Sequence, residues 1–203
     1  RFWQEHPEWR EVPAAGVKLP SWRQAMNLEN PACRAAALKF MTEVVHRWPW
    51  DGVNLAELNF DGEANGDMPE QLVPMNADVR AAFTAQHRFD PRELFTQASP
   101  HFWKRDQAGW RAFLAMRRAI VLRWHREFLA ALRPFAAQGR EVVLTALDSL
   151  EYPAVTANTG VDTTDIIALA REFPFTLQVE DPATAWTDPP TRYRRLAERY
   201  RAI

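Results

Sequence analysis

Hydrophobic and polar residues follow two different periods along the chain, and these predict helices and strands in turn. Apolar residues at positions 37, 38, 41, 44, 45 and 48 recur with the spacing of one helical face. They follow Asn30-Pro31, a favourable helix start, and they end before Pro49, so we expect a helix over residues 31–48. Short apolar runs rich in strand-forming residues predict three buried strands, near residues 52–60, 141–148 and 174–181.

A long helical insertion is predicted between the first two strands, near residues 76–137. Capping residues and prolines divide it into three expected helices, over about 76–87, 90–95 and 99–135. Further helices are expected from Asp162 to about Glu172 and from Pro190 to about Tyr200. By contrast, residues 1–30 keep no period, and their prolines and tryptophans indicate a long ordered loop.

Strands that alternate with helical patterns indicate parallel βαβ units, so we expect an α/β fold in a single domain over residues 1–203. Three strands are few for this many helices and aromatic residues. A complete (β/α)8 barrel needs about 250 residues, and this chain starts at Arg1 without Met. We therefore expect a partial TIM-type barrel, with missing segments or a partner chain supplying the rest.

Composition narrows the classes of function that the chain can have. The formal net charge of −1 gives no electrostatic footprint for nucleic acid. No run approaches the roughly 20 apolar residues that span a bilayer, so we expect no membrane-spanning segment. The single cysteine, Cys33, excludes an internal disulfide, and the five histidines show no metal-ligand spacing. With no phosphate-binding or dinucleotide-binding glycine motif either, we expect no cofactor and no metal.

Acidic residues stand at the carboxyl ends of all three predicted strands: Glu57, Asp148 and Glu180. Catalytic groups of parallel α/β proteins gather at this edge of the sheet. Paired carboxyls suit the cleavage of a glycosidic bond, because one donates a proton while the other stays ionised. The sequence therefore predicts Glu57 as the proton donor, with Glu180 or Asp148 as the base or nucleophile.

Four further residues are predicted to bind substrate. Trp50 and Trp186 are candidate platforms for sugar rings, and Asn59 and Asp61 follow Glu57 closely. Carboxylates together with Asn59 would also suit a hard cation such as magnesium or calcium, which is the competing use of the same groups.

The chain resembles the bacterial barrel glycoside hydrolases and hydrolase-like proteins. The resemblance lies in Phe2-Trp3 with His6-Pro7-Glu8-Trp9, in Met26-Asn27-Leu28 with Asn30-Pro31, and in the run from Trp50 to Glu57. It implies that the Asp51-Gly52 turn enters a barrel strand ending in a catalytic carboxylate, so that Glu57 is the general acid and Glu180 a candidate partner. It also implies a polysaccharide substrate and a periplasmic or extracellular location.

Two alternatives stay open. The chain can be a carbohydrate-binding or scaffold barrel domain that does not catalyse a reaction. It can also be an enolase-type metal-dependent barrel enzyme, since Val179-Glu180-Asp181-Pro182 is similar to the metal-ligand strand of that superfamily. The second alternative is the weaker one, because the lysine-containing strand of that superfamily has no counterpart here.

Overall fold

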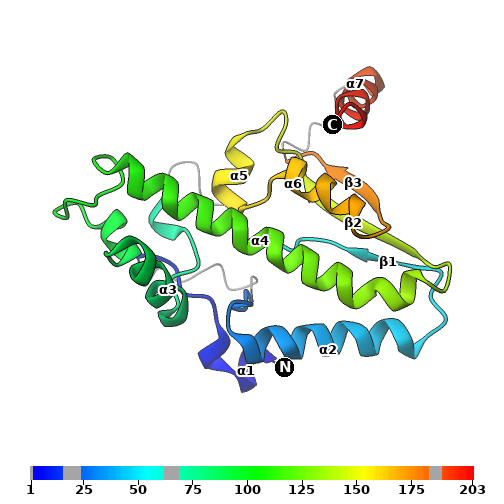
Figure 1. The fold of residues 1–203 in the computed structure, drawn as a ribbon, viewed down its shortest axis with the longest axis horizontal. Helices are drawn as coiled ribbons and strands as arrows, with labels where there is room; N and C mark the ends of the chain where they lie inside the picture. The colour runs from blue at the N-terminus through cyan, green and yellow to red at the C-terminus, as the bar shows by residue number, and fades with distance from the viewer. Residues whose placement is uncertain (1, 16–23, 62–68, 183–188) are drawn as a thin grey trace.

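The computed structural model describes residues 2–15, 24–61, 69–182 and 189–203. It shows an α/β fold with a small parallel sheet of three strands in the order β1-β2-β3 (Figure 1). The strands are β1 (Gly52–Leu55), β2 (Glu141–Leu147) and β3 (Thr176–Glu180). The predicted α/β class and all three strand positions are confirmed. The first strand is shorter than predicted, because the backbone turns into a positive φ of 55° at Glu57.

Most helices follow the predicted pattern, but the short helix over Ala154–Thr159 was not predicted, and two other predictions need correction. Their bounds are α1 (Phe2–Glu5), α2 (Pro31–Arg47), α3 (Ala77–His87), α4 (Gln107–Ala136), α5 (Ala154–Thr159), α6 (Thr163–Ala168) and α7 (Pro190–Arg201). Short 3-10 helices span Pro7–Trp9, Pro69–Gln71, Pro91–Phe95 and Leu169–Arg171. The expected helix start at Ser99 was wrong: α4 begins after Asp106, whose side chain accepts from the amide of Gly109 at 2.8 Å. Residues 2–9 are also more regular than predicted, since they form α1 and a 3-10 turn.

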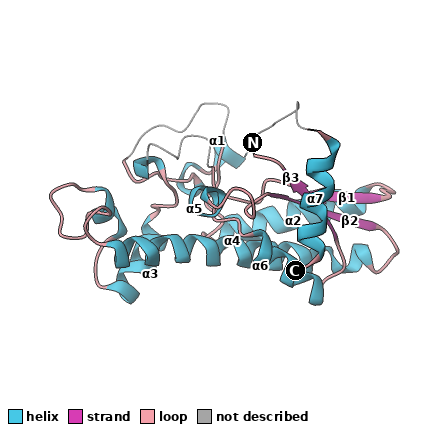
Figure 2. Ribbon diagram, turned by 90° about the horizontal axis from the view of Figure 1, so that it is seen from above, coloured by secondary structure: helices cyan, strands magenta, loops and turns pink. Residues whose placement is uncertain are grey.

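One face of the sheet packs against helices. The register aligns Val53 with Val142 and Leu55 with Leu144, so these side chains share a face. They join one hydrophobic core with α4, whose Ile120 and other side chains are almost fully buried. Figure 1 shows α4 crossing the sheet and α2 running beside it. In Figure 2, α4 and α6 are drawn below the strands, and α3 lies at the far end of α4 from the sheet.

The opposite face of the sheet is more polar and more open. Asn54, Thr176 and Gln178 are exposed on it, and the hydroxyl of Thr145 donates to the Asn54 side chain at 2.9 Å. All-parallel sheets are normally covered on both faces.

The helical insertion adds a second, smaller hydrophobic cluster between α3, the turn over Pro91–Phe95 and the first half of α4. Its buried members are Leu72, Met75, Phe83, Phe89, Leu94 and Phe113. Because α4 contributes to both clusters, the insertion is joined rigidly to the sheet. None of the described helices is long and apolar enough to cross a membrane.

The last helix, α7, is held at the carboxyl end of the sheet by polar contacts. Arg192 forms an ion pair with Asp181, which follows β3, and a second with Glu151 at 3.0 Å. The hydroxyl of Tyr200 donates to Asp148 Oδ1 at 2.6 Å. The acid that ends β2 therefore anchors a helix.

Candidate functional site

The turn after β1 presents a group of polar side chains at the carboxyl edge of the sheet. Glu57 takes the left-handed conformation, and its carbonyl accepts from the amide of Asn59 at 2.8 Å. Directly after Asn59, Phe60 is fully buried, and its amide donates to the carbonyl of Thr159 at 3.1 Å. Phe60 thereby fixes the turn to the core, and the residues on either side of it, Asn59 and Asp61, line the cleft described below.

A second segment, residues 10–12, runs beside this turn and is held by hydrogen bonds on both sides. The amide of Glu11 donates to the carbonyl of Ala25 at 3.1 Å. On the other side, Asn76 accepts from the amide of Val12 at 3.1 Å and donates to the carbonyl of Arg10 at 2.8 Å. The backbone around Glu11 is thus fixed by contacts from two distant parts of the chain, and its side chain points inward.

These two segments, residues 24–28, α2 and α4 line a cleft of about 490 Å³. Three carboxyl groups line it, from Glu11, Glu57 and Asp61. The remaining lining residues are two amides and a set of apolar side chains: Gln24, Asn59, Ala25, Met26, Leu28, Ala37, Leu58 and Trp124. Such a mixture of apolar walls and convergent polar groups is typical of small-molecule and substrate sites.

The carboxyl groups of the cleft lie in contrasting environments. Glu57 is exposed, whereas Glu11 is only 8% exposed and its Oε2 atom has no hydrogen-bond partner. Burial raises the pKa of Glu11 to about 8; the positive charge of Arg117 opposes this rise and the negative charge of Asp61 adds to it. Glu11 is therefore protonated at neutral pH.

Arg117 lies behind Glu11 as a fully buried cation on α4. Its guanidinium donates to three main-chain carbonyls: those of Val73 and Asn158, both at 2.7 Å, and that of Ala157. Burial lowers the pKa of Arg117 to about 9, and the Coulombic attraction of Glu11 partly offsets this. The guanidinium thus ties α4 to the loop at Val73 and to α5, and its charge acts on the buried acid.

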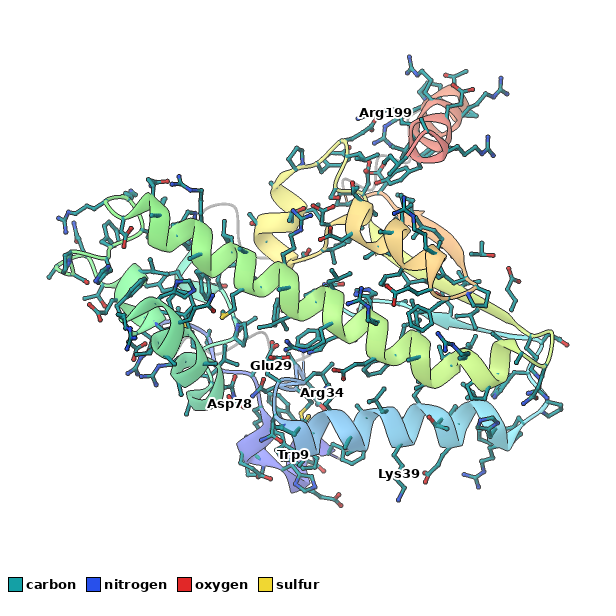
Figure 3. All side chains as sticks on the ribbon, in the orientation of Figure 1. Trp9, Glu29, Arg34, Lys39, Asp78 and Arg199 are labelled. Carbon is teal, nitrogen blue, oxygen red and sulfur yellow. The ribbon has the colours of Figure 1, made fainter. Side chains whose placement is uncertain are left out.

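Trp124 closes the cleft as an apolar wall. The ring is 2% exposed and meets Phe60 edge to face at a centroid distance of 4.8 Å. Its Nε1 donates to Glu29 Oε1 at 2.9 Å, and Figure 3 shows Glu29 close to Arg34 at the start of α2. A ring so enclosed excludes water from the floor of the cleft and does not serve as an open stacking platform.

The structure brings together three of the residues predicted from the sequence: Glu57, Asn59 and Asp61 all line the cleft. Asp148 and Glu180 are not among its lining residues. Asp148 is fully buried and accepts from the amide of Leu150 at 2.9 Å as well as from Tyr200, and its Oδ2 atom has no partner.

The other predicted residues are spread more widely. Glu180 is exposed at the end of β3, aligned with Leu147 of β2. Trp50 precedes β1 and so lies at the opposite end of that strand from Glu57; its Nε1 donates to the carbonyl of Val44 at 3.1 Å. Trp186 lies outside the described residues.

Glu11 and Trp124 are two cleft residues whose place in the cleft the sequence did not reveal. Glu11 lies in a segment without periodicity, and its burial depends on contacts with residues 25 and 76. No local pattern carries that information. Trp124 belongs to the apolar stripe of a predicted helix, which indicated its burial but not the cleft beside it.

Comparison of the chain with family models, curated proteins and solved structures gave no match. Within the described part of the chain, no group of three or more His, Cys, Asp or Glu side chains is arranged to hold a metal ion.

Proposed function

We propose that the protein is a glycoside hydrolase that cleaves a polysaccharide at the cleft containing Glu57. The observation that carries this proposal is the convergence of three carboxyl groups in one cleft, one exposed (Glu57) and one buried (Glu11). Acid–base cleavage of a glycosidic bond needs two carboxyls in different protonation states, and contrasting environments provide them.

The polar residues beside Glu57 support a sugar substrate. Asn59, Asp61 and Gln24 offer amide and carboxylate groups along the cleft, which suit the hydroxyl groups of a sugar ring. The apolar side chains of Met26 and Leu58, which line the same cleft and are partly exposed, suit the less polar faces of the same rings.

We also propose that the three strands belong to a (β/α)8 barrel. The strands are parallel, neighbours in sequence are neighbours in the sheet, and the helical core lies on one face. In a barrel the open face carrying Asn54 and Gln178 would become the interior. The predicted partner, Glu180, would then stand at the same rim as Glu57. Adjacent strands are about 4.8 Å apart, so the ends of β1 and β3 lie about 10 Å from one another.

The alternative is a carbohydrate-binding or scaffold domain that uses the same cleft without cleavage. Asp148 favours this alternative, because it is buried and hydrogen-bonded to Tyr200 of α7. An acid that anchors a helix in this way is not available as a second catalytic group.

Binding and cleavage measured together separate the two functions. The wild-type protein is incubated with a panel of neutral, acidic and acetylated polysaccharides, with release of reducing ends and calorimetric binding followed in parallel. Glu57→Gln and Glu180→Gln are compared with Glu198→Gln, an exposed control on α7. The hydrolase proposal predicts cleavage that Glu57→Gln abolishes while binding persists. Binding without cleavage by the wild type establishes the alternative, and neither activity on any polysaccharide refutes both.

A further inference from the structure

We infer that Glu11, at the buried floor of the cleft, is the proton donor to the glycosidic oxygen of the polysaccharide. This inference rests on the proposed hydrolase function. It assigns the donor role to a residue on the clamped segment 10–12 and leaves Glu57 as the base or nucleophile, which reverses the role predicted for Glu57 from the sequence.

The first argument is geometric. Glu11 is more than nine-tenths buried, lines the same cleft as Glu57 and Asp61, and has an Oε2 atom without a hydrogen-bond partner. Buried polar atoms almost always have a partner, and an exception calls for an explanation. A glycosidic oxygen in the cleft would supply that partner.

The second argument is electrostatic. The charged or titratable groups that act on Glu11 come from three elements: Arg117 on α4, Asp61 after β1, and Cys33 on α2. The Cys33 thiol is neutral at ordinary pH, since burial and the nearby Glu11 raise its pKa to about 11. Desolvation outweighs the attraction of Arg117, so the pKa of Glu11 rises to about 8 and the carboxyl keeps its proton below that pH. A general acid must carry its proton at the working pH, and Glu11 meets that condition.

The third argument is the different solvent exposure of Glu57 and Glu11, which suits them to different steps of the reaction. Glu57 is exposed and can reach water, whereas Glu11 is walled by Trp124 and by the clamped backbone. As the bond between the anomeric carbon and the glycosidic oxygen breaks, its electron pair stays with the oxygen, which takes the proton of Glu11. Water then delivers a hydroxyl to the anomeric carbon and loses a proton to the Glu57 carboxylate. Solvent afterwards removes that proton and restores the one on Glu11, so that the net reaction is hydrolysis.

The test compares two substrates that differ in their need for an acid. Glu11→Gln, Glu57→Gln and the control Glu198→Gln are assayed on the natural polysaccharide and on an aryl glycoside of the same sugar with a nitrophenolate leaving group. A good leaving group departs without protonation. We therefore expect Glu11→Gln to lose about 10²–10⁴-fold in rate on the polysaccharide and to keep most of its rate on the aryl glycoside. Glu57→Gln should lose activity on both substrates.

A pH profile adds a readout that a purely structural role would not move. The rate of the wild type on the polysaccharide should fall above about pH 8, where Glu11 loses its proton. The same fall should be absent from the aryl glycoside reaction. If Glu11→Gln cleaves the polysaccharide at the wild-type rate, or loses both substrates equally while remaining folded, Glu11 is not the donor.

Difference infrared spectroscopy tests the inference without any enzyme assay. The spectrum of the wild type minus that of Glu11→Gln should show a protonated carboxyl at neutral pH that disappears near pH 8. A carboxylate band at neutral pH overturns the inference whether or not the protein cleaves a glycan. A wild type that cleaves no glycan overturns the hydrolase proposal instead, so the two failures are distinct.

Discussion

Replacing Glu11 with Gln should remove a large pH dependence of stability. Burial raises the pKa of Glu11 from an ordinary value of 4.5 to about 8 in the folded protein. The folded state therefore holds this proton more tightly than the unfolded chain. The stability that the group contributes is fully present below pH 4.5 and is lost as the pH rises through about 8. At 1.36 kcal/mol per pKa unit, the loss between about pH 4.5 and pH 9 amounts to about 4 kcal/mol.

Urea unfolding at these two pH values measures the effect. Gln keeps the shape of a protonated carboxyl but does not ionise, so the variant should escape the loss. Other groups titrate in both proteins and cancel in the comparison. With an m value of about 2 kcal/mol/M, the urea midpoint of Glu11→Gln relative to the wild type should rise by about 2 M between the two pH values. Parallel pH dependence of the two midpoints would refute the assignment of a buried, protonated Glu11.

Three further predictions concern the packing of α4 against its neighbours. His125 is buried, its Nδ1 donates to the carbonyl of Val121 at 2.8 Å, and burial lowers its pKa to about 4. The free energy of unfolding of the wild type should therefore fall by about 3 kcal/mol as the pH falls from 6.5 to 4. Thermal unfolding of His125→Phe should lack that loss of stability. Gly160 and Gly139 both have φ near +78°, but a Cβ on Gly160 would lie 2.8 Å from Val121 Cγ2, while one on Gly139 meets nothing within 4 Å. Gly139→Ala should cost about 1–2 kcal/mol and Gly160→Ala about 1–3 kcal/mol more; equal midpoints in chemical denaturation would contradict the close approach. Arg117→Met should lower the free energy of unfolding by about 3–5 kcal/mol in the same assay, because it leaves three buried carbonyls without a donor. A change below about 1 kcal/mol would contradict the stabilising role of the Arg117 guanidinium.

The sequence predicted those elements whose signals are local. The cap at Asn30 is confirmed, since its side chain accepts from the amides of Ala32 and Cys33 at 3.0 and 3.1 Å. Apolar periodicity likewise located α2, capping residues and prolines located α3, and short apolar runs located all three strands. The start of α4 was misplaced because Ser99-Pro100 is itself a valid helix signal, and nothing local showed that Asp106 would provide the cap instead.

The cleft was predictable only in part. Glu57, Asn59 and Asp61 follow a strand directly, so the general rule for parallel sheets placed them at the correct edge. Glu11 could not be found in this way, because its burial depends on contacts with residues 25 and 76 that no local period encodes. The partial barrel and the pairing of Glu57 with Glu180 or Asp148 stay predictions.

The structure also refines the meaning of an acid at a strand end. Three such acids occupied similar positions in the sequence, and Glu57 was preferred among them as the proton donor. In the folded protein, Glu57 lines the cleft, Glu180 is exposed at the rim, and Asp148 is buried beneath α7. Position at a strand end therefore identifies a candidate, while the environment of the carboxyl decides what it does.

The central claim is that the cleft containing Glu57 hydrolyses glycosidic bonds. The most direct measurement is the initial rate at which new anomeric protons appear in the ¹H NMR spectrum of a polysaccharide, for the wild type and for Glu57→Gln at equal concentration. We predict a rate for the wild type that falls about 10²–10⁴-fold in the variant, with both proteins equally folded. Equal rates in the two proteins would contradict the account.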